Sequence, residues 1–175
     1  VGNNAGQAVT TGLSNTIIGS NAAYALTTSN SNTAIGKSAL AAETSSNGNT
    51  AVGEGALQVQ NVGGSGDARN TAVGLLAGDD ISTGYKNTCI GAFAGNNLTT
   101  GNENVFLGYD VVTNTASDGK QIAIGMAMNS VGAGYITMGN TVDGRIYNQF
   151  SSNASWTRTS DERIKKDIQT NTDLG

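Results

Sequence analysis

Polar and apolar positions alternate in a five-residue unit that recurs along most of the chain. Each early unit consists of Asn, Thr, a small or aliphatic residue, an aliphatic residue and Gly, as in Asn32–Gly36 and Asn49–Gly53. Alternation over so few residues, bounded by Gly and polar residues, predicts short β-strands. A helix is not expected, because Gly costs about 1 kcal/mol relative to Ala in a helix interior.

The closing glycine of each unit sets a regular spacing. These glycines are Gly2, Gly19, Gly36, Gly53, Gly74, Gly91, Gly108, Gly125 and Gly139, so that six of the steps between them are 17 residues long, one is 21 and the last is 14. A coil this short cannot bury its apolar face alone and needs neighbours stacked on it. The sequence therefore predicts an all-β fold, a parallel β-roll or β-solenoid of 17-residue coils, over residues 1–139.

Two further positions of each coil are predicted from the same alignment. Ala lies three residues after the closing glycine in six coils, which indicates a second corner made of small residues. Between the corners comes a polar stretch such as Asn96–Gly101, whose Leu98 is expected to point inward while Thr and Gly turn the chain.

The aliphatic residue just before each closing glycine is never polar, and we expect this column to face the interior. Its members are Ile18, Ile35, Val52, Val73, Ile90, Leu107, Ile124 and Met138. The column of small residues beside it, with Ala34, Ala51 and Ala72, is then expected on the outer face. Small residues there would let coils approach one another, so we predict a parallel homotrimer around a common axis.

The strand Thr and Asn residues are expected to form ladders along the stack. The interpretation we prefer is that they satisfy one another's hydrogen bonds and cap strand ends. An alternative is that the Thr column, Thr16, Thr33, Thr50, Thr71 and Thr88, forms the flat array of an ice-binding solenoid.

The 21-residue step contains extra residues within 59–69, which are expected to bulge outward as a loop. Gly63–Asp67 resembles a calcium-binding nonapeptide only once and not in tandem, while Asp79, Asp80 and Asp110 are expected to be solvated turn residues. No metal and no cofactor is therefore expected.

Composition and charge exclude several classes of function. The chain has 37% hydrophobic and 13% charged residues, no Pro and a net charge of −4, which disfavours both a conventional globular core and a nucleic-acid binder. There is no His, which excludes a Ser-His-Asp triad and His-based zinc sites. Cys89 is alone, so no disulfide within the chain is expected, and no apolar run approaches the roughly 18 residues of a membrane span.

The repeated Asn-Thr-Ala-Ile/Val-Gly-x-x-Ala unit resembles the head repeats of trimeric autotransporter adhesins of the YadA type and similar repeats of phage tail fibres. The resemblance covers residues 1–139 and implies a trimeric β-roll. The adhesin repeat is usually shorter and closer to the 14-residue final step.

The segment Trp156–Ile168 resembles the opening of the endosialidase-type intramolecular chaperone, the peptidase S74 family, with Ile164 in place of the usual Leu. This resemblance implies that Ser160 is the nucleophile for scission of the Ser160–Asp161 bond and that Lys165 is its base. A lysine ammonium, with a pKa near 10.4 in water, can act as a base only if burial in the assembled trimer lowers that pKa.

A simpler interpretation is that Ser160 caps a short helix over 161–168. Because only fifteen residues follow Ser160, and because Val1–Gly2 enters in mid-repeat, we expect this chain to be part of a longer protein that holds the rest of the chaperone.

The sequence thus predicts three regions: the repeat shaft over 1–139, a trimeric β transition segment over 140–160 with Tyr147, Phe150 and Trp156 closing the trimer end, and the start of the chaperone over 161–175. The predicted function is a structural and receptor-binding segment of a trimeric phage tail fibre on the virion, outside the cell, with a host surface receptor or glycan as partner and no membrane insertion. The alternative is the head of a bacterial trimeric adhesin. Apart from self-cleavage, no enzyme activity is expected.

Overall fold

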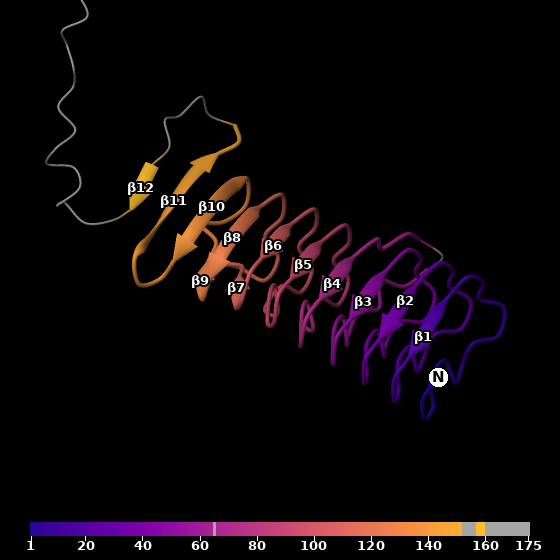
Figure 1. The fold of residues 1–175 in the computed structure, drawn as a ribbon. Coiled ribbons are helices and arrows are strands. Elements are labelled where there is room, and N and C mark those ends of the chain that lie inside the picture. Colours follow the sequence, from indigo (N-terminus) through magenta and orange to yellow (C-terminus); the bar gives the residue numbers. More distant parts are fainter. Residues whose placement is uncertain (65, 152–156, 160–175) are drawn as a thin grey trace, which may run out of the picture.

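A computed structural model describes residues 1–64, 66–151 and 157–159. This part of the chain is all-β and contains no helix; it forms an elongated parallel β-solenoid in which each coil contributes one short strand to a continuous sheet (Figure 1). The predicted fold class is confirmed.

The long sheet runs the length of the solenoid in the order β1-β2-β3-β4-β5-β6-β8-β10-β11-β12, with parallel pairing from β1 to β10. The strands of the repeat are β1 (Thr16–Ile18), β2 (Thr33–Ile35), β3 (Thr50–Val52), β4 (Thr71–Val73), β5 (Thr88–Ile90), β6 (Val105–Leu107), β8 (Ile122–Met126) and β10 (Tyr135–Asn140). Equivalent residues pair within the repeat: Thr pairs with Thr, and Ile35 pairs with Val52. A short second sheet pairs β7 (Val111–Val112) with β9 (Met128–Asn129).

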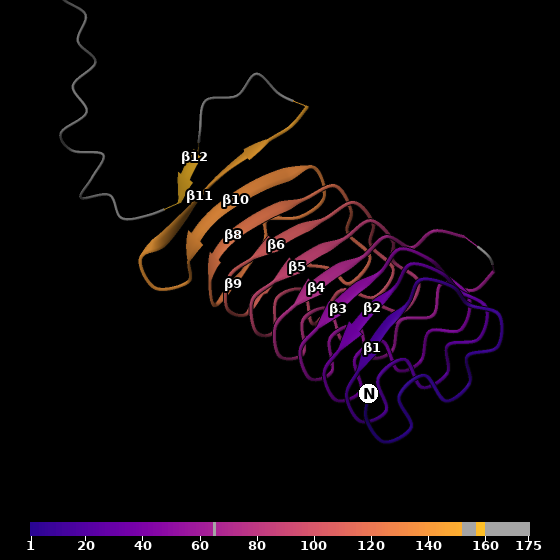
Figure 2. The same cartoon turned by 45° about the vertical axis from the view of Figure 1, so that its right-hand side comes forward.

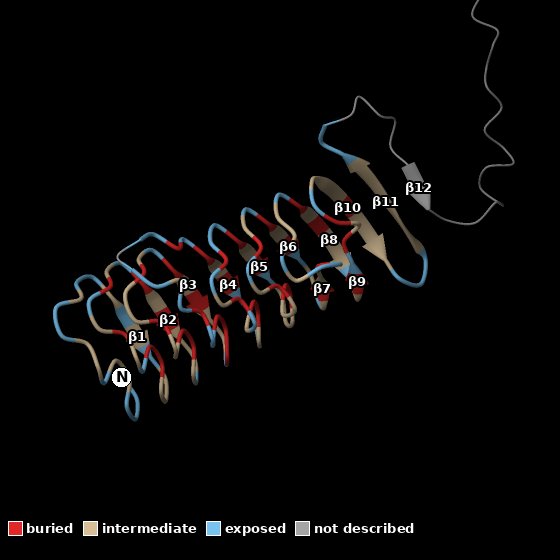
Figure 3. Cartoon of the chain, turned by 180° about the vertical axis from the view of Figure 1, so that it is seen from behind, coloured by how far each residue is buried: buried red, intermediate tan, exposed pale blue. Residues whose placement is uncertain are grey.

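The predicted interior face was wrong. The central residue of the strand is fully buried from β2 onward in the repeat, as in Ala51 and Ala72, whereas the aliphatic residue after it faces outward, with Val73 37% exposed. Figure 3 shows the buried segments recurring at matching places in successive coils. The small column therefore lines the inside, and it cannot be the surface along which coils approach one another.

A narrow interior explains this choice of face. The wall opposite the strands already carries bulky residues, because Leu26, Leu40, Leu57, Ile81 and Leu98 are all fully buried in the same cluster as the strand alanines. Where these residues fill the interior, close packing leaves room for little more than Ala on the strand. In the coil of β6, where Phe106 lies against Gly95, this large side chain is fully buried at the same position. Leu98, the single apolar residue of its polar stretch, is buried as predicted.

A ladder of buried Asn residues precedes the strands and ties the coils together. The Asn87 side chain accepts a hydrogen bond from the backbone N–H of Asn104 at 3.1 Å and donates one to the Gly101 carbonyl at 2.9 Å, both in the next coil. The same pattern is repeated in Asn32 and Asn70. Amides buried in this way are satisfied by the stack itself, as predicted.

The two corners of each coil also match the prediction. Ala22 donates its backbone N–H to the Gly19 carbonyl at 3.3 Å, and the same turn closes from Gly53 to Ala56 and from Gly91 to Ala94. Most of the closing glycines have φ near +135°, and a Cβ added at Gly74 would lie 2.5 Å from the Gly91 carbonyl oxygen. No other residue fits, because the backbones of adjacent coils meet at this point.

Beyond the parallel stack the chain folds back. β11 (Gly144–Gln149) pairs antiparallel with β10, and β12 (Thr157–Thr159) pairs antiparallel with β11. The rings of Tyr135 and Tyr147 meet edge to face at 6.0 Å. Both strands lie within the segment predicted to be extended. Winding of this segment about a threefold axis stays a prediction, as does the division into three regions. Phe150 is 53% exposed in this chain, and Trp156 lies outside the described residues.

Candidate binding surfaces

The outer face of the long sheet carries two columns of side chains, Thr and aliphatic. The aliphatic column alternates between exposed and half-buried members: Ile18 is 46% exposed, Ile90 39% and Leu107 42%, whereas Ile35, Val52, Ile124 and Met138 are half-buried. The strands β4, β5 and β6 lie side by side (Figure 2). Val73 pairs with Ile90 and Ile90 with Leu107, so these side chains are neighbours along the stack. A continuous apolar stripe in register is characteristic of a contact surface, unlike isolated exposed apolar residues.

The stripe widens toward the C-terminal end of the solenoid. The residue after each closing glycine is Lys37 and Glu54 in two earlier coils, where the two side chains form an ion pair at 2.9 Å. In later coils the same position holds Leu75, Tyr109 and Met126, which are 44%, 53% and 56% exposed. The surface is therefore more polar near the N-terminal end and more apolar near the C-terminal end.

The strand Thr hydroxyls behave differently from the prediction. Thr33, Thr50 and Thr71 lie in register, but no hydrogen bond from their hydroxyls to any described residue is formed. They face outward beside the aliphatic column, so that the outer sheet face alternates hydroxyl and apolar side chains. Of these two repeated polar columns, Asn and not strand Thr supplies side-chain hydrogen bonds between coils.

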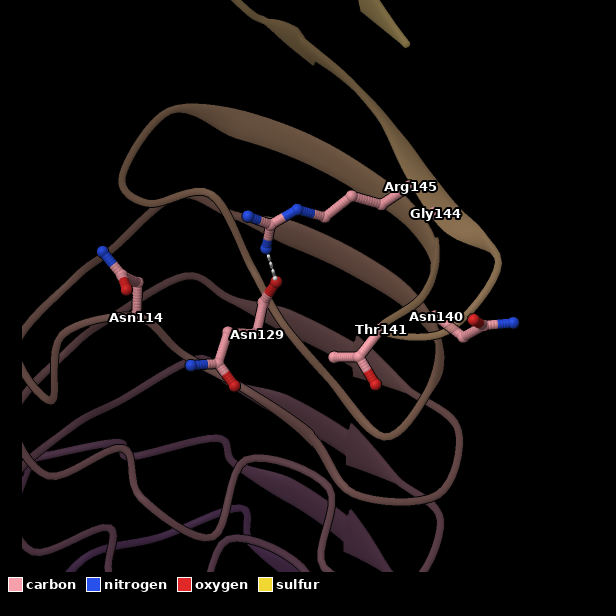
Figure 4. A pocket seen from close by; sticks show the side chains of 6 residues that line it. All are labelled: Asn114, Asn129, Asn140, Thr141, Gly144 and Arg145. Carbon is pink, nitrogen blue, oxygen red and sulfur yellow. Dashed lines mark hydrogen bonds between the residues drawn. The ribbon is translucent and has the colours of Figure 1, made fainter. Parts of the chain in front are cut away.

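A polar pocket of about 430 Å³ lies where the hairpin of β10 and β11 meets the last coils. It is lined by Asn114, Asn129, Asn140, Thr141, Gly144 and Arg145 (Figure 4). The Arg145 guanidinium donates to the Asn129 carbonyl oxygen at 2.6 Å. The Asn140 side chain is used within the hairpin turn, where it accepts hydrogen bonds from the backbone N–H groups of Val142 and Asp143.

One coil has an acid in its core. Glu43 is fully buried at the position that holds Leu26 in the preceding coil, and its Oε1 accepts backbone N–H bonds from Thr44, Ser45 and Ser46 at 2.8 to 2.9 Å. Its Oε2 accepts from the Gln60 side chain at 2.9 Å, and Gln60 in turn accepts from Asn70. Both oxygens of this carboxyl group thus accept hydrogen bonds that hold the turn beside the insertion.

The insertion itself is exposed, as predicted, and residues 63, 64, 66 and 67 face solvent. Asp67 pairs with Arg69 and accepts from Asn47. No cluster of three or more His, Cys, Asp or Glu residues able to hold a metal ion occurs among the described residues.

Two titratable groups are perturbed by burial. Burial first, and then the charge of Asp80, raise the pKa of Asp79 to about 6, and the Oδ1 of Asp79 is buried without a hydrogen-bond partner. The prediction that Asp79 is a solvated turn residue was therefore wrong. Burial raises the pKa of the Cys89 thiol to about 12, which keeps it protonated and unreactive at neutral pH.

The predicted catalytic residues Ser160 and Lys165 lie outside the described residues, as does the Ser160–Asp161 bond. In the part of the chain that the structure covers, no helix has the length and hydropathy needed to cross a membrane. Sequence reasoning missed Glu43 and Gln60, although both depart from the apolar residue found seven positions after Gly19, Gly74 and Gly91, and this departure was the signal.

Searches against protein-family models, curated proteins and solved structures find nothing that matches this chain. Its function is therefore inferred from its own residues.

Proposed function

We propose that the chain is a shaft segment of a trimeric attachment fibre, formed by three parallel copies that pack through the outer face of the long sheet. The observation that supports this is the apolar stripe of Ile18, Val73, Ile90 and Leu107, exposed in a single copy and in register from coil to coil.

The energetics favour self-association. Fully burying an exposed aliphatic side chain contributes about 1.5–3 kcal/mol. The column offers one aliphatic side chain per coil, and because these are at most 46% exposed in a single copy, each contributes only part of that amount. Parallel copies around an axis along the fibre bring equivalent residues of each coil together. Each aliphatic residue of the column would then pack against the same residue of the neighbouring copies. The number of copies, three, comes from the resemblance to adhesin heads and tail-fibre repeats.

The roles that follow are extension, resistance to proteolysis and presentation of surface to a host receptor, with the phage tail fibre preferred because of the segment around Ser160. A bacterial adhesin head shares the same shaft. Immunogold electron microscopy of the intact parent protein discriminates them: labelled rods on a virion support the tail fibre, and label on a bacterial outer surface supports the adhesin.

Sedimentation equilibrium of the protein at micromolar concentration tests the association. A mass three times that of the 17.6 kDa chain is expected. A folded species at the mass of one chain would contradict the proposal.

A second candidate, ice binding, is favoured by one observation: the strand Thr hydroxyls lie in register, face outward and bond to no described residue. An ice-binding face must be free of partner chains, so a monomer with thermal hysteresis would support this function, and a trimer without hysteresis would support the fibre.

A further inference from the structure

A shallow depression lies on the corner of the solenoid that precedes the strands. In three successive coils the same position is occupied by Tyr85, Asn102 and Gly119, and the next position by Lys86, Glu103 and Lys120. The Asn102 side chain accepts the Tyr85 N–H at 2.9 Å, and the Lys120 N–H donates to the Asn102 carbonyl at 2.9 Å. The coil stacking therefore holds these side chains at fixed spacing.

The depression lies where this column of side chains is interrupted by a glycine. Gly119 follows Asn102 in register, and a Cβ added there would lie 2.8 Å from the Asn102 carbonyl oxygen. The space left measures about 300 Å³ and is lined by Tyr85, Asn102, Glu103, Ser117, Gly119 and Lys120.

The lining combines one aromatic ring with donors and acceptors of hydrogen bonds. Tyr85 is 39% exposed, and the Lys86 ammonium lies over its ring, 5.5 Å from the centroid, which leaves at most the other face of the ring for a ligand. Glu103 is held toward this ring by its ion pair with Lys86 at 3.4 Å. Lys120 and Ser117 add a cation and a hydroxyl on the other side of the glycine.

A sugar ring matches this arrangement better than an anion does. A hexose presents an apolar C–H face to an aromatic ring and hydroxyls that both donate and accept at its edge. A phosphate or sulfate would meet the Glu103 carboxylate on a chain whose net charge is −4, at a cost in repulsion. A few placed polar groups around one aromatic wall are typical of small-ligand sites.

We infer that this depression is a saccharide-binding site that takes one neutral hexose unit of a surface glycan, with Tyr85 as the stacking platform and Glu103 and Lys120 as hydrogen-bonding partners. This inference rests on the proposed function, because it names the receptor class of the fibre. Its position over the coils of β5 and β6 would repeat the site once per chain in an assembly.

The test is binding of the assembled protein to an array of immobilised neutral oligosaccharides that contain glucose, galactose, mannose or N-acetylglucosamine, followed by titration calorimetry with the strongest binder. The variants are Tyr85→Ala and Glu103→Gln, and the matched control is Tyr24→Ala, which removes a tyrosine of similar exposure, 47%, from a different corner. We expect at least a tenfold loss of affinity for Tyr85→Ala, a smaller loss for Glu103→Gln and none for the control.

Absence of binding to every neutral oligosaccharide on the array, or equal affinity of Tyr85→Ala and Tyr24→Ala, would overturn the inference. Circular dichroism shows whether each variant is folded. If the Tyr85→Ala variant is unfolded, the Glu103→Gln variant becomes the test. An affinity of Glu103→Gln equal to that of the control would then overturn the inference. Sedimentation of the same samples distinguishes the two proposals. A trimer that binds no saccharide would contradict only this inference, whereas a monomer would contradict the proposed assembly of the fibre.

Discussion

Val73 and Ile90 are paired across neighbouring coils, and both side chains point away from the core, at 37% and 39% exposure. Their strand neighbours Ala72 and Cys89 are paired in the same register and are fully buried. The larger side chain of each pair is therefore on the outside, which is the reverse of an ordinary half-buried strand. The proposed trimer interface follows from this relationship.

Ile90→Asp is expected to disrupt the trimer while leaving the coil folded. A carboxylate in the centre of an apolar contact loses its hydration without gaining a partner, so sedimentation should show dissociation to smaller species at micromolar concentration. Val59→Asp is the matched control, since Val59 is 46% exposed but lies at the insertion, off the strand face. Equal masses for the two variants would contradict the assignment of the interface.

Ala51→Leu and Val52→Leu test which face of the strand is inside. Ala51 is fully buried, so the larger side chain overpacks the narrow core and is expected to cost about 3 kcal/mol. Val52 points outward, and the one-carbon enlargement to Leu there should change the free energy of unfolding by less than about 0.5 kcal/mol. Urea denaturation of both variants measures the difference, and the opposite ranking would restore the face predicted from sequence.

Gly74→Ala is expected to destabilise the stack by about 3 kcal/mol or more, because the residue has φ +139° and its Cβ would meet the Gly91 carbonyl. Gly66→Ala provides the control: nothing lies within 4 Å of its Cβ position. Thermal unfolding should separate the two variants clearly. Similar midpoints would mean that adjacent coils do not meet closely at Gly74.

Asp79 predicts a pH dependence of stability. Its pKa in the folded chain, about 6, lies above the 3.8 of an unperturbed Asp. The folded state therefore binds the proton more tightly than the unfolded chain, and this stabilisation is present below about pH 4 and is lost as the pH rises through 6.

Asp79→Asn should reduce this loss, because the amide stays neutral at every pH. Urea denaturation at pH 4 and pH 7 measures the change for both proteins, and Asp80→Asn should reduce it partially by removing the second cause of the shift. An identical change in the native protein and in Asp79→Asn would show that this carboxyl contributes nothing.

Self-cleavage at the Ser160–Asp161 bond stays a prediction from the resemblance to the chaperone family. In the intact parent protein, Ser160→Ala should prevent shortening, and Lys165→Ala should slow it, because both the nucleophile and its base are needed. Mass spectrometry of the purified product checks this. A product of the shortened mass from the Ser160→Ala protein would rule out Ser160 as the nucleophile.

Much of the fold was predictable because its constraints are local and repeated. The spacing of Gly19, Gly36 and Gly53 reports one turn of a coil, and the strict glycine reflects a backbone contact made at the same place in every coil. The buried Asn ladder was predictable for the same reason, since each Asn bonds to its counterpart in the next coil. A contact between coils that is made at the same place in every coil appears in the sequence as a regular spacing of the residue that makes it.

The binding surfaces were less predictable, because they depend on which side chains from different coils meet. The depression beside Tyr85 is lined by residues of three successive coils, and the buried position of Glu43 depends on backbone N–H groups that only the folded turn aligns. Neither has a motif of its own. The segment around Ser160 presents the opposite case, a motif without described structure.

By itself the sequence determined the coil, its corners and its stacking, because a 17-residue rhythm of Gly, Ala and Asn permits little else. Only the tertiary structure decided which strand face is inside. Period-two alternation separates Ala51 from Val52 but does not say which of them faces the core. Around Ala51 that choice follows from Leu40 and Leu57, which are buried in the same cluster and leave room only for the smaller side chain.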